Sequence, residues 1–281
     1  MSRWPALDSV EAWRALEDAT RVAVGRAVAA TLDERFAAHE ELVGMERLPS
    51  LSHADWPGLR FIIVPGGQFV MGLADSDIEE LSEYIDWTRD VRLTVEAMLR
   101  FTRPEHRVVV APFVTAERAL NRTEVERLSA GFKSPLHTDE VERSAASELV
   151  KAMGMRLPSE AELEWMARDA GRSAFVCNGG RFWYGKRAWP EEGVFGVRDL
   201  HVGEWAADDW HPSYEGAPST SAPWMDGNPC GVFRGELPYG VDQNPLELCY
   251  GLAAHRNRGA LPQDRHSDHA FFTLRPSLDL L

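Results

Sequence analysis

Residues 156–171, RLPSEAELEWMARDAG, place several carboxylates close together, which raises the prospect of general acid and base chemistry. Ser159 stands where a helix cap is expected, and Glu162 three residues later completes a capping box. Glu160 and Glu162 then fall in the first turn, where carboxylates oppose the positive end of the helix dipole. Gly171 is placed to end this helix. We therefore interpret the glutamates as capping and solvated groups rather than as a catalytic cluster.

Thiols and imidazoles are the other groups that could bind a metal. The cysteines are Cys177, Cys230 and Cys249, an odd number that favours reduced thiols over a disulfide framework, although one pair could hold a metal ion. Cys177 precedes a glycine turn and is interpreted as a small buried apolar group. His266 and His269 form a His-x-x-His string that could place two imidazoles on one metal. Their polar surroundings favour surface histidines instead.

The composition narrows the class of protein. The chain has 281 residues, 44% of them hydrophobic, and a formal net charge of −14. A nucleic-acid partner is not expected, because phosphate binding depends on lysine and arginine. No stretch reaches the roughly 20 apolar residues of a membrane span, and the N-terminus lacks the apolar core of a signal peptide. We expect a cytoplasmic globular protein with no membrane partner.

The elements that must position these groups follow from hydrophobic spacing. Residues 8–42 read as one long alanine-rich helix, opened by a capping box of Asp8 and Glu11. RFIIVPGGQFVMG, from residue 60, predicts two short strands joined by a tight turn. Residues 76–101 predict an inserted helical segment capped by Ser76 with Glu79. A strand at 106–113 and a helix at 139–153 follow, and ordered loops are expected after residue 172.

The order of these fragments resembles the formylglycine-generating enzyme family, also called the sulfatase-modifying factor family. IIVPGGQFVMG resembles its opening hairpin, PEHRVVVAPF the next strand, and ALNRTEV a segment that leads a helix. Successive family motifs are resembled by RLPSEAELEWMARDAG, FWYG and FGVRDLHVGEWAADDW. The closing strands are resembled by VFRGE and HRNRGALPQDRHSDHAFFTLR. The resemblance covers residues 61–275. It implies an irregular, loop-rich α+β domain of the C-type-lectin-like kind at 61–281, with the insertion at about 76–101 and an added N-terminal helix within a helical extension at 1–60.

Oxidising members of this family bind copper through two cysteines, since thiolates suit Cu(I). The first cysteine position falls on or near Gly240, and the second lies about one residue from Cys249, so Cys230 would have to substitute for the missing thiol. The family's calcium loop has His201 at its asparagine position, and imidazole suits calcium poorly. Asp199 and Glu204 remain there as oxygen ligands or as loop anchors. Related sulfoxide synthases use a histidine iron site.

The leading interpretation is a non-catalytic member that binds a peptide, a protein or a small polar ligand, and no cofactor is assigned to it. Arg256 and Arg258 match the family's closing arginine motif and are expected to tie loops together. The alternatives are a copper-dependent oxidase acting on a substrate cysteine through Cys230 and Cys249 and, more weakly, an iron enzyme using His266 and His269. The acidic charge favours a basic partner. The predicted binding surface comprises Trp224, Arg234, Glu236, Tyr239, Cys249 and Tyr250.

Overall fold

The computed structural model describes most of the chain. The described residues are 3–82, 88, 93, 95–97, 99–130, 142–174, 183–184, 187–188, 193–200, 203–235, 256–258 and 273–280. Within them, no helix has the length and apolar character that crossing a membrane requires.

The N-terminal region is not one helix. A 3-10 turn (Pro5–Leu7), α1 (Val10–Arg14) and α2 (Asp18–Ala29) are followed by strands β1 (Phe36–Val43) and β2 (Leu48–His53). The cap of α1 is Ser9, which accepts a hydrogen bond from the amide of Ala12, and not Asp8. The prediction of a helix over 8–42 is therefore wrong. Its last part, from Phe36, forms strand β1 because it pairs with β2, a non-local interaction that helix propensity does not reveal.

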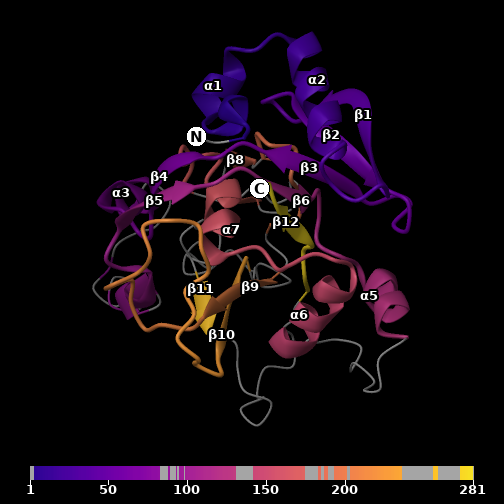
Figure 1. Ribbon diagram of the computed structural model, residues 1–281. Helices are drawn as coiled ribbons and strands as arrows, with labels where there is room; N and C mark the ends of the chain where they lie inside the picture. The colour runs from indigo at the N-terminus through magenta and orange to yellow at the C-terminus, as the bar shows by residue number, and fades with distance from the viewer. Residues whose placement is uncertain are drawn as a thin grey trace.

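The largest sheet is antiparallel and has the strand order β1-β2-β3-β6-β12 (Figure 1). Its further members are β3 (Arg60–Val64), β6 (Phe113–Ala116) and β12 (Ser277–Asp279). The sheet thus joins strands from both sides of residue 60 and brings the end of the chain back beside its middle. Helix α2 packs closely on β2, where a side chain on Gly25 would collide with Pro49.

The predicted strands around Pro65 exist but do not form a hairpin. β3 pairs with β2 and β6, whereas β4 (Gly67–Met71) pairs with β5 (His106–Val110) in a separate sheet. The turn between β3 and β4 is held by residues that are distant in the sequence. Gly66 donates its amide to Leu7, and the indole of Trp165 donates to the carbonyl of Pro65.

The inserted segment begins one residue earlier than expected. α3 spans Asp75–Ser82, so Ser76 lies inside the helix, and Asp77 accepts the amide of Ala74 instead. Residues 93, 95–97 and 99 are also helical, and a 3-10 turn follows at Arg100–Thr102. The predicted strand at 106–113 divides into β5 and β6. The other helices are α5 (Arg122–Ser129), α6 (Arg143–Ala152) and α7 (Glu160–Ala167).

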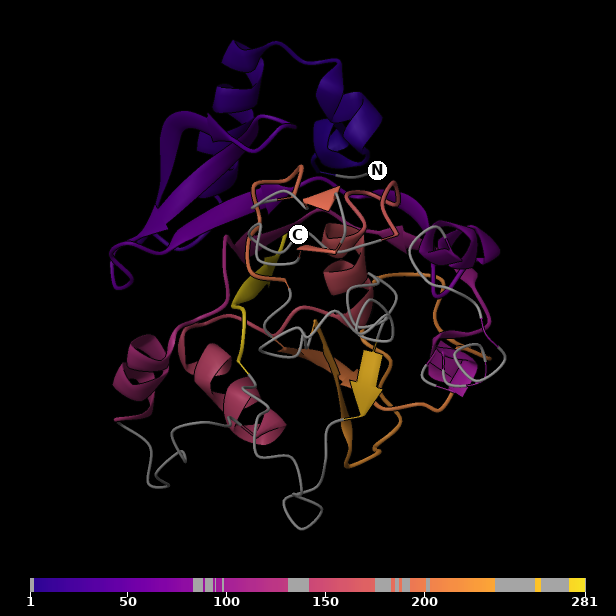
Figure 2. The same cartoon turned by 180° about the vertical axis from the view of Figure 1, so that it is seen from behind.

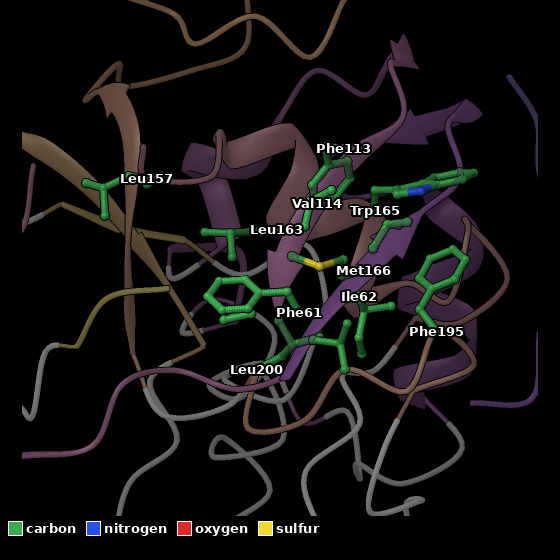
Figure 3. Close-up of a cluster of buried hydrophobic side chains, with 14 of the residues drawn as sticks. Phe61, Ile62, Phe113, Val114, Leu157, Leu163, Trp165, Met166, Phe195 and Leu200 are labelled. Carbon is green, nitrogen blue, oxygen red and sulfur yellow. The ribbon is translucent and has the colours of Figure 1, made fainter. Parts of the chain in front are cut away.

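Helix α7 lies at the centre of the molecule, between the large sheet and a smaller one (Figures 1 and 2). The smaller sheet has the order β11-β10-β9 and consists of Arg256–Arg258, Gly231–Arg234 and Glu204–Asp209. A short pair, β7 (Trp183–Tyr184) and β8 (Arg187–Ala188), is separate. Apolar side chains from α7 and the large sheet, among them Phe61, Trp165 and Met166, form the core (Figure 3). The irregular α+β class is confirmed.

Candidate functional site

Helix α7 begins with the predicted capping box. Ser159 accepts the amide of Glu162, and the Glu162 carboxylate accepts the amide of Ser159. The other part of the interpretation is wrong, because the glutamates are not solvated: Glu160, Glu162 and Glu164 are at most 3% exposed. Glu162 is neutralised by Arg156, whose two terminal nitrogens each lie 2.7 Å from its oxygens. Burial on every side of the helix requires charged partners for the remaining two carboxylates.

The partners of Glu160 come from distant parts of the chain. One oxygen accepts the hydroxyl of Tyr214 at 2.7 Å and a guanidinium nitrogen of Arg234 at 2.9 Å. The Nε atom of Arg256 lies 2.7 Å from the same oxygen. The guanidinium of Arg256 is stacked over the rings of Trp210 and Tyr214. The expectation that Arg256 ties loops together is consistent with this position.

Glu164 is held by a second set of partners. Arg234 and Arg168 donate to its two oxygens at 2.8 and 2.7 Å, and the amide of Gly72 donates at 2.8 Å. Burial disfavours the charged form, but the two arginines outweigh it and hold the pKa of Glu164 below its usual range. Arg168 also forms a bidentate pair with Asp77. These contacts clamp α7 to α3 and β10.

Asp208 connects the start of α7 to the loop at 210–230. Its two oxygens accept the amides of Glu160 at 2.6 Å and Trp224 at 2.8 Å. Burial, reinforced by the negative charge of Glu160, raises the pKa of Asp208 to about 7. The carboxyl therefore exchanges its proton near neutral pH while supporting the backbone of Trp224.

The same loop is fixed by Asp209. Its carboxylate accepts Arg143 at 2.8 Å and the amides of Asp226 and Gly227 at 2.9 and 2.8 Å. Beside these contacts, the rings of His211 and Trp224 stack with centroids 3.6 Å apart and planes 5° from parallel. The loop is an ordered surface feature.

Two residues of the predicted binding surface are described. Trp224 is half-buried in this loop. Arg234 is 5% exposed and hydrogen-bonded to Glu160 and Glu164, so it lies in the interior, and its contact with a ligand stays a prediction. The following predicted residues lie outside the described part of the chain: Glu236, Tyr239, Cys249, Tyr250, His201, His266 and His269.

The predicted metal ligands are only partly described. Glu204 is buried and bidentate with Arg275, at 2.7 and 2.6 Å, so it anchors the loop and does not fit a calcium site. Asp199 is half-buried, and Cys230 is buried among apolar side chains. Among the described residues, no three histidine, cysteine or acidic side chains cluster as a metal site would require.

Asp208, His211 and Tyr214 are absent from the predicted site. One sequence signal does point toward the buried network. A spacing of four residues separates Glu160 from Glu164 and Glu164 from Arg168. They lie on one face of a helix whose other positions are mostly apolar. A helix that is apolar on all sides belongs in the interior, and charges on it then need internal partners.

Comparison with known proteins supports the fold. The structure of PvdO from Pseudomonas aeruginosa is similar, with a TM-score of 0.53 and 24% sequence identity over 79% of this chain and 94% of that chain. The structure of Treponema denticola variable protein 1 also matches, with a TM-score of 0.48 and 13% identity over 80% and 97%. No family profile matches the sequence, and no curated protein matches it. The likeness to PvdO identifies an irregular α+β fold of that type.

Proposed function

We propose that the protein is a non-catalytic ligand- or protein-binding member of the formylglycine-generating enzyme-like family. The ordered motifs over 61–275 and a fold similar to that of PvdO support the family. Fold alone does not define an activity, so the function has to be argued from the side chains.

The buried carboxylates support a structural role for α7. Glu160, Glu162 and Glu164 are each neutralised by arginine and shielded from water. A general acid or base needs access to a substrate proton, and within the described part of the chain these carboxylates are at most 3% exposed. Gly240, at the position of a family copper cysteine, further supports the loss of the oxidase chemistry.

The observation that carries the binding proposal is the ordered loop around Trp224. Its indole is backed by His211 and its amide is held by Asp208. Met225 next to it is 59% exposed, and the side chain of Asp226 is 51% exposed. An aromatic anchor beside an exposed apolar group and a carboxylate is typical of a recognition surface, and fixing it in advance lowers the entropy lost on binding.

The partner that fits this surface is a basic peptide segment. Asp226 offers a negative charge beside the apolar pair of Trp224 and Met225, and the net charge of −14 attracts cations over a longer range. Arg234 serves this surface indirectly, as part of the interior framework. Direct contacts from Glu236, Tyr239, Cys249 and Tyr250 remain predictions.

Selection from a displayed peptide library tests this proposal. The immobilised full-length chain should enrich peptides rich in lysine and arginine, and synthetic copies should lose about tenfold or more in affinity with Trp224→Ala or Met225→Ser. Met45→Ser is the matched control, because Met45 is 66% exposed elsewhere on the surface. Equal affinity for the Met225→Ser and Met45→Ser proteins would exclude this loop as the binding surface.

The copper oxidase is the main alternative, and it requires Cys230 and Cys249 to share one ion. Two thiolates are suitable ligands for Cu(I), which in the oxidising members supplies the oxygen chemistry. An iron enzyme using His266 and His269 is the weaker alternative. Loss of Fe(II) binding on replacing either histidine would support it.

A further inference from the structure

The stacked pair of His211 and Trp224 has polar surroundings that distinguish it from an ordinary aromatic contact. The Nδ1 atom of His211 lies 3.0 Å from the carbonyl oxygen of Asp209. Its Nε2 atom lies 3.1 Å from a carboxylate oxygen of Asp226 but has no aligned hydrogen bond. Both ring nitrogens therefore face oxygens.

Neither oxygen can donate a proton to the ring. A carbonyl only accepts, so Nδ1 carries the hydrogen. An ionised carboxylate also only accepts, so a neutral ring would turn its Nε2 lone pair toward the negative charge of Asp226. The imidazolium form donates from Nδ1 and places its positive charge 3.1 Å from the Asp226 carboxylate. A cation lying flat on the indole of Trp224 is also attracted by the face of the ring.

Other charged groups surround the stack on each packed element. From β9, Asp209 binds the Asp226 amide, and Asp208 binds the amide of Trp224. From α6, Arg143 pairs with Asp209, so the positive charge on this side is already compensated. From β11, Arg256 lies over Trp210 and pairs with Glu160. Among the described residues, the exposed Asp226 is the carboxylate within ion-pair distance of the ring, at 3.1 Å from Nε2.

We propose that protonation of His211 controls how firmly Trp224 is held, making this loop a proton-sensitive recognition surface. With the imidazolium, Trp224 is fixed against the ring and presented in one orientation. With the neutral ring, the contact with Asp226 becomes repulsive and Trp224 is released. This inference rests on the proposed function, since it gives the regulation of the same surface.

The experiment uses the full chain labelled with 5-fluorotryptophan, with the ¹⁹F resonance of Trp224 assigned by its loss in Trp224→Phe. Between about pH 5 and 8, where histidines change charge, part of the movement of this resonance should parallel the ring proton signals of His211, beside the separate response of the Asp208 carboxyl near pH 7. The part that parallels His211 should vanish in His211→Gln, which leaves only the response of Asp208.

Two controls separate His211 from its neighbours. Glu215→Gln removes an exposed carboxylate from the same loop and should leave the response in place. Asp208→Asn removes the carboxyl beneath the Trp224 amide and with it that carboxyl's own response near pH 7, and it should leave the part of the response that follows the ring signals of His211. A response lost entirely in Asp208→Asn but kept in full in His211→Gln would overturn the proposal, as would a Trp224 signal that ignores pH. The titration needs no partner, so failure of peptide selection would not be mistaken for failure of the switch.

Discussion

Glu164 and Arg234 are 70 residues apart in the chain, yet their carboxylate and guanidinium groups lie 2.8 Å apart in the interior. The side chain of Glu164 is fully buried and that of Arg234 is 5% exposed. Together they join the central helix α7 to strand β10. The acidic run that resembles a catalytic cluster in the sequence is therefore a framework of internal ion pairs.

Glu164→Gln should destabilise the protein strongly. Removing one member of a buried ion pair leaves charge without a partner, which costs about 3 to 5 kcal/mol. Chemical denaturation of the variant should show this loss in the free energy of unfolding. The control is Glu126→Gln, which breaks the exposed pair of Glu126 with Arg122 and should cost less than about 0.5 kcal/mol. Equal losses would contradict the framework role of Glu164.

Gly67→Ala should also destabilise the protein, because an added Cβ would lie 2.7 Å from the ring of Trp165. Overpacking of this kind costs about 1 to 3 kcal/mol. In a Trp165→Phe background the smaller ring leaves more space, so the same substitution should cost less. A double-mutant cycle measures the difference, and purely additive losses would mean that the two residues do not interact.

Asp208 should give the unfolding free energy a distinct pH dependence. Burial raises its pKa to about 7 in the folded protein, well above the usual range of an aspartate. The folded state therefore holds the proton more tightly than the unfolded state does. The resulting stabilisation of the fold is fully present below about pH 4 and is lost as pH rises through 7. The asparagine side chain in the Asp208→Asn protein has no proton to exchange in this pH range. The free-energy difference between wild type and variant should fall across this interval, and a constant difference would contradict the assignment.

Local patterns in the sequence predict much of the central architecture. The capping box of Ser159 and Glu162, helix α6 and strand β4 all depend on neighbours a few residues away. Strand β1 falls in the segment that the sequence predicts as helix, because this segment becomes a strand only through its pairing with β2, for which the sequence analysis makes no prediction. The β3–β4 hairpin was wrong for a related reason, since Trp165 and Leu7 hold the turn from distant positions.

The site shows the same limit more strongly. Trp224 was predicted from its place in the order of motifs, and it lies on an ordered surface loop. The burial of Glu160 and its contact with Tyr214 depend on which segments surround α7, and the local sequence does not state this. The local sequence likewise does not reveal that Arg234 is buried, and the prediction therefore places it on the binding surface.

The most direct test of the non-catalytic account is oxygen uptake by the purified chain after loading with Cu(I), in the presence of a cysteine-containing peptide. The account predicts uptake no greater than that of the Cys249→Ser protein under the same conditions. Uptake by the wild type that stops in Cys249→Ser, together with loss of the bound copper, would contradict it and establish the oxidase.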